Sequence, residues 1–221
     1  FCLPALPHIK RGAMIAMDAA TAIDITPVLS ERTAVWPGDT PVERKVLLDM
    51  GKGDNLTLSG ITTTVHLGAH ADGPNHYGHP APSIGDMPLK HYLGECQVIA
   101  CNATRGQRVR VDQIVGGVGQ VTCPRVLIKT SSFDGFSAWN SDFCGLEAEL
   151  VEQLAARGVI TIGVDTPSVD PQTSKGLEAH KAIFKAGIAI IEGLALGAVG
   201  PGRYVMSAAP LPLVGFDASP V

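Results

Sequence analysis

Residues 65–76 read Val-His-Leu-Gly-Ala-His-Ala-Asp-Gly-Pro-Asn-His and carry four side chains that can bind a metal within eleven positions. These side chains are His66, His70, Asp72 and His76. Imidazole and carboxylate groups hold zinc and similar divalent ions in open catalytic sites that retain a water. The cluster therefore indicates hydrolysis or dehydration by a metal-bound hydroxide. Four histidine and aspartate side chains that serve only for packing or as surface groups would not need this spacing.

The residues before the cluster predict a strand that leads into it. Residues 61–65 form the β-branched run Ile-Thr-Thr-Thr-Val, which is typical of a strand. In extended geometry, residues 66, 68, 70 and 72 point to one face, and Gly68 leaves room between the two histidines. Gly73 and Pro74 would end this strand, and they disfavour a helix in its place.

The second half of the chain offers two further candidate donors. His180 is its only histidine, and Glu192 closes the apolar run over residues 188–191. An ionised carboxylate is costly to bury without a partner or a metal. Glu192 is therefore either an ordinary residue at the end of a strand or, together with His180 and the first cluster, a bridging ligand.

The composition is typical of an ordinary enzyme and excludes several other classes of protein. The 221 residues can bury one substantial core, and one domain is expected. A net charge of −4 with scattered basic residues argues against a nucleic-acid surface. The apolar stretches are too short to span a membrane. Five cysteines without a Cys-x-x-Cys motif predict reduced thiols in a cytoplasmic protein.

The N-terminal residues are expected to lie outside the folded domain. Residues 1–16 are interpreted as an extension that is disordered or left by cloning, because the chain starts at Phe1 and lacks the pattern of a signal peptide. The folded domain is expected over residues 17–221.

Strand-like runs recur along the domain with only a few helices. The clearest helix is expected over residues 146–157, with Leu150, Val151 and Leu154 on one face and Gly158 as its C-terminal stop. A shorter helix is expected to begin near residue 174 and to carry His180. Strands are expected at residues 22–26, 45–50, 56–65, 97–102, 125–129, 160–164, 188–192 and 203–208.

Several separated motifs resemble the metal-dependent cyclase family and, within it, the bacterial-type kynurenine formamidases (arylformamidases). The resemblance implies a single-domain, β-rich α/β fold of the swivelling β/β/α type. It extends from about residue 22 to the C-terminus and rests on Val35-Trp-Pro-Gly-Asp39, His66 to His76, Gly163-Val-Asp-Thr-Pro-Ser168, Glu178-Ala-His180, Glu192-Gly-Leu194 and Asp217-Ala-Ser-Pro-Val221.

The resemblance also implies a role for each candidate residue. His76 would be the general acid/base, and Trp36 would contact the substrate, although its sequence context also fits an ordinary core tryptophan. Leu67 and Ala69 replace threonines that are common in the family, which affects hydrogen bonding behind the ligands and hence the choice of substrate. Two divalent ions, zinc or else manganese, would be held by His66, His70, Asp72, His180 and Glu192, with Asp72 and Glu192 bridging them.

The activity that the resemblance implies is hydrolysis of N-formyl-L-kynurenine to L-kynurenine and formate, a step of tryptophan degradation, by a homodimer. A second hypothesis is hydrolysis of another small amide or lactam, such as isatin. A third is a catalytically silent protein that binds metal or oligomerises on the same scaffold. The presence of every candidate ligand together with His76 weighs against the third hypothesis. Neither a nucleic acid nor a membrane is expected as a partner.

Overall fold

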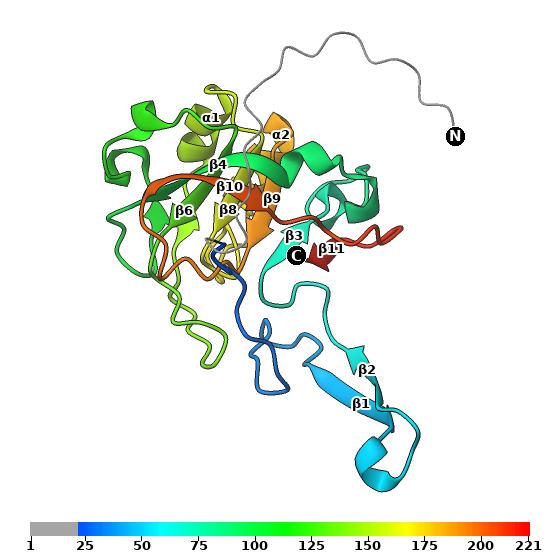
Figure 1. Cartoon of the computed structure of the whole chain (residues 1–221). Helices are drawn as coiled ribbons and strands as arrows, with labels where there is room; N and C mark the ends of the chain where they lie inside the picture. Colours follow the sequence, from blue (N-terminus) through cyan, green and yellow to red (C-terminus); the bar gives the residue numbers. More distant parts are fainter. Residues whose placement is uncertain (1–21) are drawn as a thin grey trace.

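The centre of the molecule is a seven-stranded mixed sheet, seen in the computed structural model of the chain, which describes residues 22–221 (Figure 1). The strand order is β10-β4-β6-β8-β9-β3-β11, and the four strands from β4 to β9 run parallel. The expected extension over residues 1–16 lies outside the described residues. The strands of the sheet are β3 (His70–Asp72), β4 (Leu93–Ala100), β6 (Arg125–Lys129), β8 (Thr161–Val164), β9 (Ala189–Glu192), β10 (Gly202–Ser207) and β11 (Ala218–Pro220).

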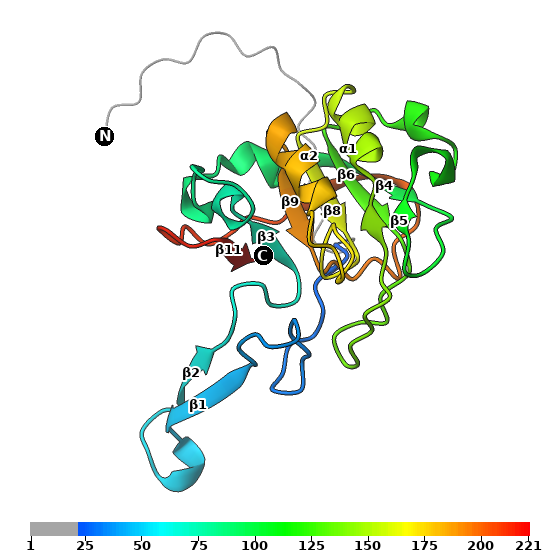
Figure 2. The same ribbon diagram turned by 180° about the vertical axis from the view of Figure 1, so that it is seen from behind.

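Both faces of the sheet are covered, as the continuous apolar runs of its parallel strands require. The helices α1 (Ala148–Ala155) and α2 (Glu178–Ala186) lie over one face (Figure 2). Their buried side chains form one core cluster with Ile162 and Ile190 of the sheet. Leu127 and Ile191 belong to a second cluster, which includes the buried ring of Tyr92. The sheet therefore separates two cores.

Two small pairs of strands lie outside the central sheet. The antiparallel strands β1 (Glu43–Leu48) and β2 (Leu58–Thr62) form a ribbon that projects from the body of the molecule (Figures 1 and 2). The other pair is β5 (Arg108–Val109) with β7 (Gly145–Leu146). Short 3-10 helices occupy Met50–Lys52, Pro74–His76, Ile84–Asp86, Leu89–His91, Val111–Gln113 and Val118–Gln120.

Most of the predicted elements are confirmed. The strand over residues 125–129 is found with the predicted bounds, and α1 buries Leu150, Val151 and Leu154 as its pattern predicts. The helix that carries His180 begins at Glu178 rather than near residue 174. The strand predicted over residues 22–26 is wrong, because these residues form no strand, and the short edge strand β11 was not among the predicted elements.

The predicted strand into the histidine cluster is also wrong. Strand β2 ends at Thr62 and belongs to the projecting ribbon, whereas the central strand begins only at His70. Between them Gly68 adopts a φ of 57°, a left-handed conformation that breaks extended geometry. His66 therefore reaches the site from a loop and does not share a strand face with His70 and Asp72.

The composition predicts that the chain has neither a membrane-spanning segment nor disulfides. Within residues 22–221, no helix is long and apolar enough to cross a membrane. None of the four cysteines in this range forms a disulfide.

Candidate metal centre

Two neighbouring antiparallel strands place three of the candidate ligands side by side. In the register of β3 and β9, His70 lies opposite Glu192. Because side chains alternate along a strand, Asp72 shares the face of His70, while Ala71 points to the opposite core. All three polar side chains are buried. Strand pairing thus brings together ligands that are more than a hundred residues apart in the sequence.

His180 reaches the same spot from α2 and is held by a carboxylate behind it. Its Nδ1 lies 2.7 Å from Oδ2 of Asp170, which also accepts the backbone N–H of His180. Oδ1 of Asp170 in turn accepts from Arg108 at 2.5 Å. This chain fixes the ring so that Nε2 faces the carboxylates of β3 and β9. Asp170 is not among the residues predicted from the sequence, although it lies two residues after the motif that ends at Ser168.

The two buried carboxylates divide their oxygens between two histidines. Nε2 of His70 lies 3.4 Å from Oδ1 of Asp72 and 3.4 Å from Oε2 of Glu192. Nε2 of His180 lies 3.8 Å from Oδ2 of Asp72 and 3.8 Å from Oε1 of Glu192. Each carboxylate therefore directs one oxygen toward each histidine, which is the arrangement expected of two carboxylates that bridge two ions.

His66 completes one half of this arrangement from its loop. Its Nδ1 lies 3.2 Å from Oδ1 of Asp72. Its Nε2 lies 3.0 Å from Oδ2 of Asp217, just before β11. Asp217 opens the C-terminal motif of the sequence, but it is not among the predicted site residues. The antiparallel pairing of β11 with β3 brings Asp217 to the site.

His76 lies at the exposed side of the cluster. Its ring centroid is 4.3 Å from that of His66 and 6.2 Å from that of His180. Nδ1 of His76 is 3.4 Å from Oδ2 of Asp217, and its side chain is 39% exposed. His76 can therefore meet a molecule that enters from solvent while it remains next to the buried donors.

The residues present fit divalent metal ions. Nε2 of His70 and both carboxylate oxygens of Asp72 are buried and have no hydrogen-bond partner among residues 22–221. Buried polar atoms without partners are rare, and nitrogen and carboxylate donors of this kind suit zinc and related ions. Three groups of candidate donors among the described residues have their atoms within 4.8 Å of one another. They are His66, His70 and Asp72; Asp72, His76 and His180; and His66, His76 and Asp217.

The pKa values of the site residues also indicate a centre that attracts positive charge. Burial alone would lower the pKa of both His66 and His180. The nearby carboxylates Asp72, Asp217 and Glu192 raise the pKa of His66 to about 9, and Asp170, Asp72 and Glu192 raise that of His180 to about 10. Burial opposes ionisation of Asp72, yet the adjacent histidines hold its pKa well below the ordinary value. Without a metal, the buried carboxylates thus retain two imidazolium ions as their counter-charges.

Trp36 lies in an aromatic cluster beside the centre. Its ring packs edge-on against Trp139 and Phe143, at centroid distances of 5.6 Å and 6.2 Å. Phe133 and Phe136 continue this cluster at a centroid distance of 5.0 Å. No ring contact joins Trp36 to a candidate ligand in the described part of the chain.

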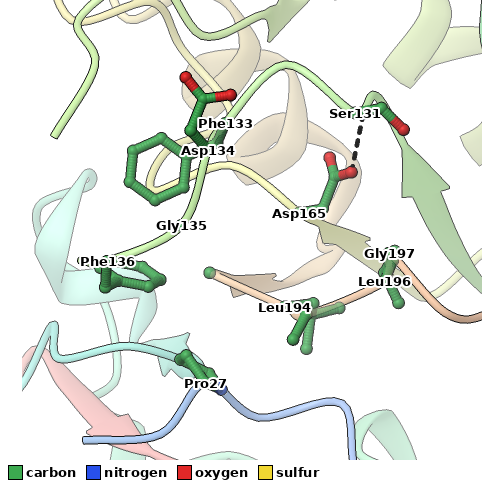
Figure 3. Close-up of a pocket in the computed structure, with 12 residues that line it drawn as sticks. Pro27, Ser131, Phe133, Asp134, Gly135, Phe136, Asp165, Leu194, Leu196 and Gly197 are labelled. Carbon is green, nitrogen blue, oxygen red and sulfur yellow. Dashed lines mark hydrogen bonds between the residues drawn. The ribbon is translucent and has the colours of Figure 1, made fainter. Parts of the chain in front are cut away.

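A pocket of about 280 Å³ opens next to this cluster (Figure 3). Its wall includes Phe133, Phe136 and Leu194, and it reaches Gly193, the residue after Glu192. Asp165 also lines the pocket, but both of its carboxylate oxygens accept hydrogen bonds from Thr130 or Ser131. The carboxylate of Asp165 therefore holds the turn after β6, and the pocket is bounded mainly by apolar groups.

The fold and the donor set define an α/β protein with a candidate metal centre. More narrowly, residues 23–171 match the family described as putative cyclase, and the chain belongs to this family. A potential metal-dependent hydrolase with cyclase activity is 29% identical, with a TM-score of 0.76 over 90% of this chain and 93% of that chain. A predicted metal-dependent hydrolase from Bacillus stearothermophilus is also 29% identical, with a TM-score of 0.74 over 90% and 94% of the two chains.

Isatin hydrolase A from Labrenzia aggregata shares the fold at 22% identity, with a TM-score of 0.76 over 90% of each chain. These similarities confirm the predicted cyclase-like α/β fold.

The raised pKa values predict how pH affects the metal-free protein. A histidine whose folded pKa exceeds its ordinary 6.5 stabilises the fold fully below that value, and this stability is lost as pH rises through the folded pKa. The stability that His66 contributes is therefore lost between about pH 6.5 and about pH 9. The stability that His180 contributes is lost between about pH 6.5 and about pH 10. We expect the free energy of unfolding of chelator-treated protein to fall by roughly 2–3 kcal/mol per pH unit between pH 7 and 9, because each of the two histidines contributes about 1.4 kcal/mol per pH unit.

Urea denaturation at several pH values measures this slope, and zinc-loaded protein is the control. Ligation would replace the two protons, so its slope is expected to be shallower. Equal slopes for the two forms would contradict the assignment of His66 and His180 to one charged centre with Asp72.

Proposed function

We propose that this chain hydrolyses N-formyl-L-kynurenine to L-kynurenine and formate, as an arylformamidase. The observation that carries this proposal is the buried pair Asp72 and Glu192, shared between His70 and His180, with the exposed His76 beside them. A merely structural ion would not need an exposed acid/base next to its ligands. The catalytically silent alternative is therefore the weaker hypothesis.

The proposed ligands are those of the sequence analysis. His66 and His70 would hold one divalent ion and His180 a second, with Asp72 and Glu192 shared between them. Zinc is the proposed metal, with manganese as the alternative. When bound, two such ions activate water as a nucleophile and polarise a carbonyl oxygen.

The proposed acid/base acts at the exposed side of the site. His76 would give a proton to the departing arylamine nitrogen, because its imidazole is near the buried donors and open to the substrate. Asp217 lies within 3.4 Å of Nδ1 of His76 and can fix the orientation of its ring. Nε2 would then be the atom that exchanges the proton.

The aromatic cluster supports an aryl substrate. Phe133 and Phe136 line a pocket that begins one residue after Glu192, and Trp36 joins the same cluster through Trp139. A flat ring gains both apolar burial and edge-on contacts in such surroundings. We therefore propose that Trp36, as a member of this aromatic cluster, contacts the substrate.

Hydrolysis of a lactam such as isatin is the second candidate. The fold shared with an isatin hydrolase favours it, and the same proposed metal ligands would serve the reaction. The two substrates differ in shape, because N-formylkynurenine has a charged amino-acid tail and isatin is a compact fused ring. The pocket residues, not the ligands, would decide between them.

Two histidine variants separate a ligand from an acid/base. His70→Ala is expected to lose both bound metal and turnover. His76→Ala is expected to retain most of the metal while turnover falls by about 10²–10⁴-fold, the usual contribution of proton transfer. Elemental analysis of purified protein, alongside kinetics, measures both quantities, and about two ions per chain are expected in the wild type. Should His76→Ala lose as much metal as His70→Ala, His76 is a ligand.

The substrate is tested by comparing hydrolysis of N-formylkynurenine and isatin in ultraviolet assays. We expect a clear preference for N-formylkynurenine. Trp36→Ala is expected to lower kcat/KM by the equivalent of about 1–3 kcal/mol, without loss of metal, because an aromatic contact is removed. A preference for isatin would favour the second candidate while leaving the proposed metal centre intact.

We also propose that the chain forms a homodimer through the β1–β2 ribbon. Isolated two-stranded ribbons are marginally stable in water. This ribbon nevertheless exposes Leu47 (54%), Met50 (64%) and Ile61 (67%). A second copy of the chain would cover these side chains.

Sedimentation equilibrium tests the proposed dimer. The wild type is expected to be dimeric, and Ile61→Glu is expected to shift it toward monomer, because a charge would be buried in the interface. Val214→Glu is the matched control, since Val214 is 88% exposed and lies away from the ribbon. A monomeric wild type would refute the proposal.

A further inference from the structure

The hydroxyl group of Tyr77 lies beside the candidate metal centre and has no role in the proposed reaction. Oη of Tyr77 is buried and has no hydrogen-bond partner among residues 22–221. A buried hydroxyl without a partner loses its hydrogen bonds to water without compensation, which costs about 1–3 kcal/mol. Such a group therefore calls for an explanation.

The position of Tyr77 is fixed by close packing. It follows the 3-10 turn Pro74–His76, and its backbone N–H closes that turn on Pro74. Its ring centroid lies 5.2 Å from that of His180 and 6.1 Å from that of Phe184, to which it stands perpendicular. The ring is thus held between α2 and the sheet, in contact with a candidate ligand.

The hydroxyl of a tyrosine carries its proton at neutral pH and can donate one hydrogen bond. A phenol in this state is not a metal ligand, so an ion in the site would not satisfy its proton.

No protein group accepts a hydrogen bond from this hydroxyl among residues 22–221. The carboxylate of Asp72 is not bonded to it, and in the proposed function that carboxylate would hold metal. A molecule bound at the centre can supply the missing acceptor oxygen.

We propose that the Tyr77 hydroxyl donates a hydrogen bond to the carbonyl oxygen of the bound substrate and is a catalytic residue. The substrate's identity rests on the proposed function, but the need for an oxygen acceptor does not. As negative charge grows on that oxygen during attack by water, the hydrogen bond strengthens. No bond to Tyr77 forms or breaks, and its proton stays on the phenol oxygen.

Tyr77→Phe tests this role, with Tyr92→Phe as the matched control. Tyr92 is fully buried in the opposite core cluster, and its hydroxyl also lacks a partner. We expect Tyr77→Phe to lower kcat by about 10²–10³-fold, as for other lost oxyanion donors, and Tyr92→Phe to change it little. Metal content is expected to be unchanged in both variants, and the melting temperature is expected to stay the same or to rise, because each variant removes a buried hydroxyl that has no partner in the protein. Loss of metal in Tyr77→Phe would show that Tyr77 supports the ligands, which overturns the proposal.

A second measurement does not depend on the identity of the substrate. Formate is a small carboxylate whose oxygens can take the place of the substrate oxygen. Calorimetric titration of zinc-loaded protein with formate is expected to show binding about 10-fold or more weaker in Tyr77→Phe than in the wild type and Tyr92→Phe. Equal formate affinities, or no binding to the wild type, would overturn the role of Tyr77. A wild type that binds formate through Tyr77 but leaves N-formylkynurenine intact would instead refute the proposed substrate alone.

Discussion

The burial of two carboxylates on adjacent strands is the constraint on which the rest of the site depends. Asp72 on β3 and Glu192 on β9 lie on the same face of the sheet, under the helices and away from water. Two anions that are desolvated so close together are very unfavourable without cations. Every nearby group follows from this requirement, because protonated histidines or metal ions must supply the missing positive charge.

The support behind the histidines alternates in charge. Arg108 bonds to Asp170, Asp170 holds His180, and His180 faces the two central carboxylates. Burial raises the pKa of Asp170, but His180 and Arg108 outweigh it and bring the value to about 2. On the exposed side, Asp217 holds His66 and approaches His76. The proposed ligands His66 and His180 are thus held by carboxylates, whereas the proposed acid/base His76 is partly exposed to solvent.

The glycine and the turn that flank β3 show where local sequence reasoning succeeds and where it fails. Gly73 and Pro74 end the strand as predicted, because proline cannot continue the pairing. The β-branched residues 61–65 predict a strand that runs on into the cluster, yet β2 ends at Thr62. Gly68 permits a left-handed turn, and a propensity summed over neighbours cannot show that tertiary packing will use it.

The sequence by itself determined the donor types and their grouping around residues 66–76, and it offered His180 and Glu192 as further candidate donors. It could do so because metal chemistry restricts the residue types and because carboxylates in apolar runs are conspicuous. Only the tertiary structure decided that His70 faces Glu192 in register, and that Asp170 and Asp217 stand behind the histidines. It also decided that the hydroxyl of Tyr77 is buried without a partner. These are contacts between distant segments, and no local periodicity encodes which side chains meet when strands and helices pack.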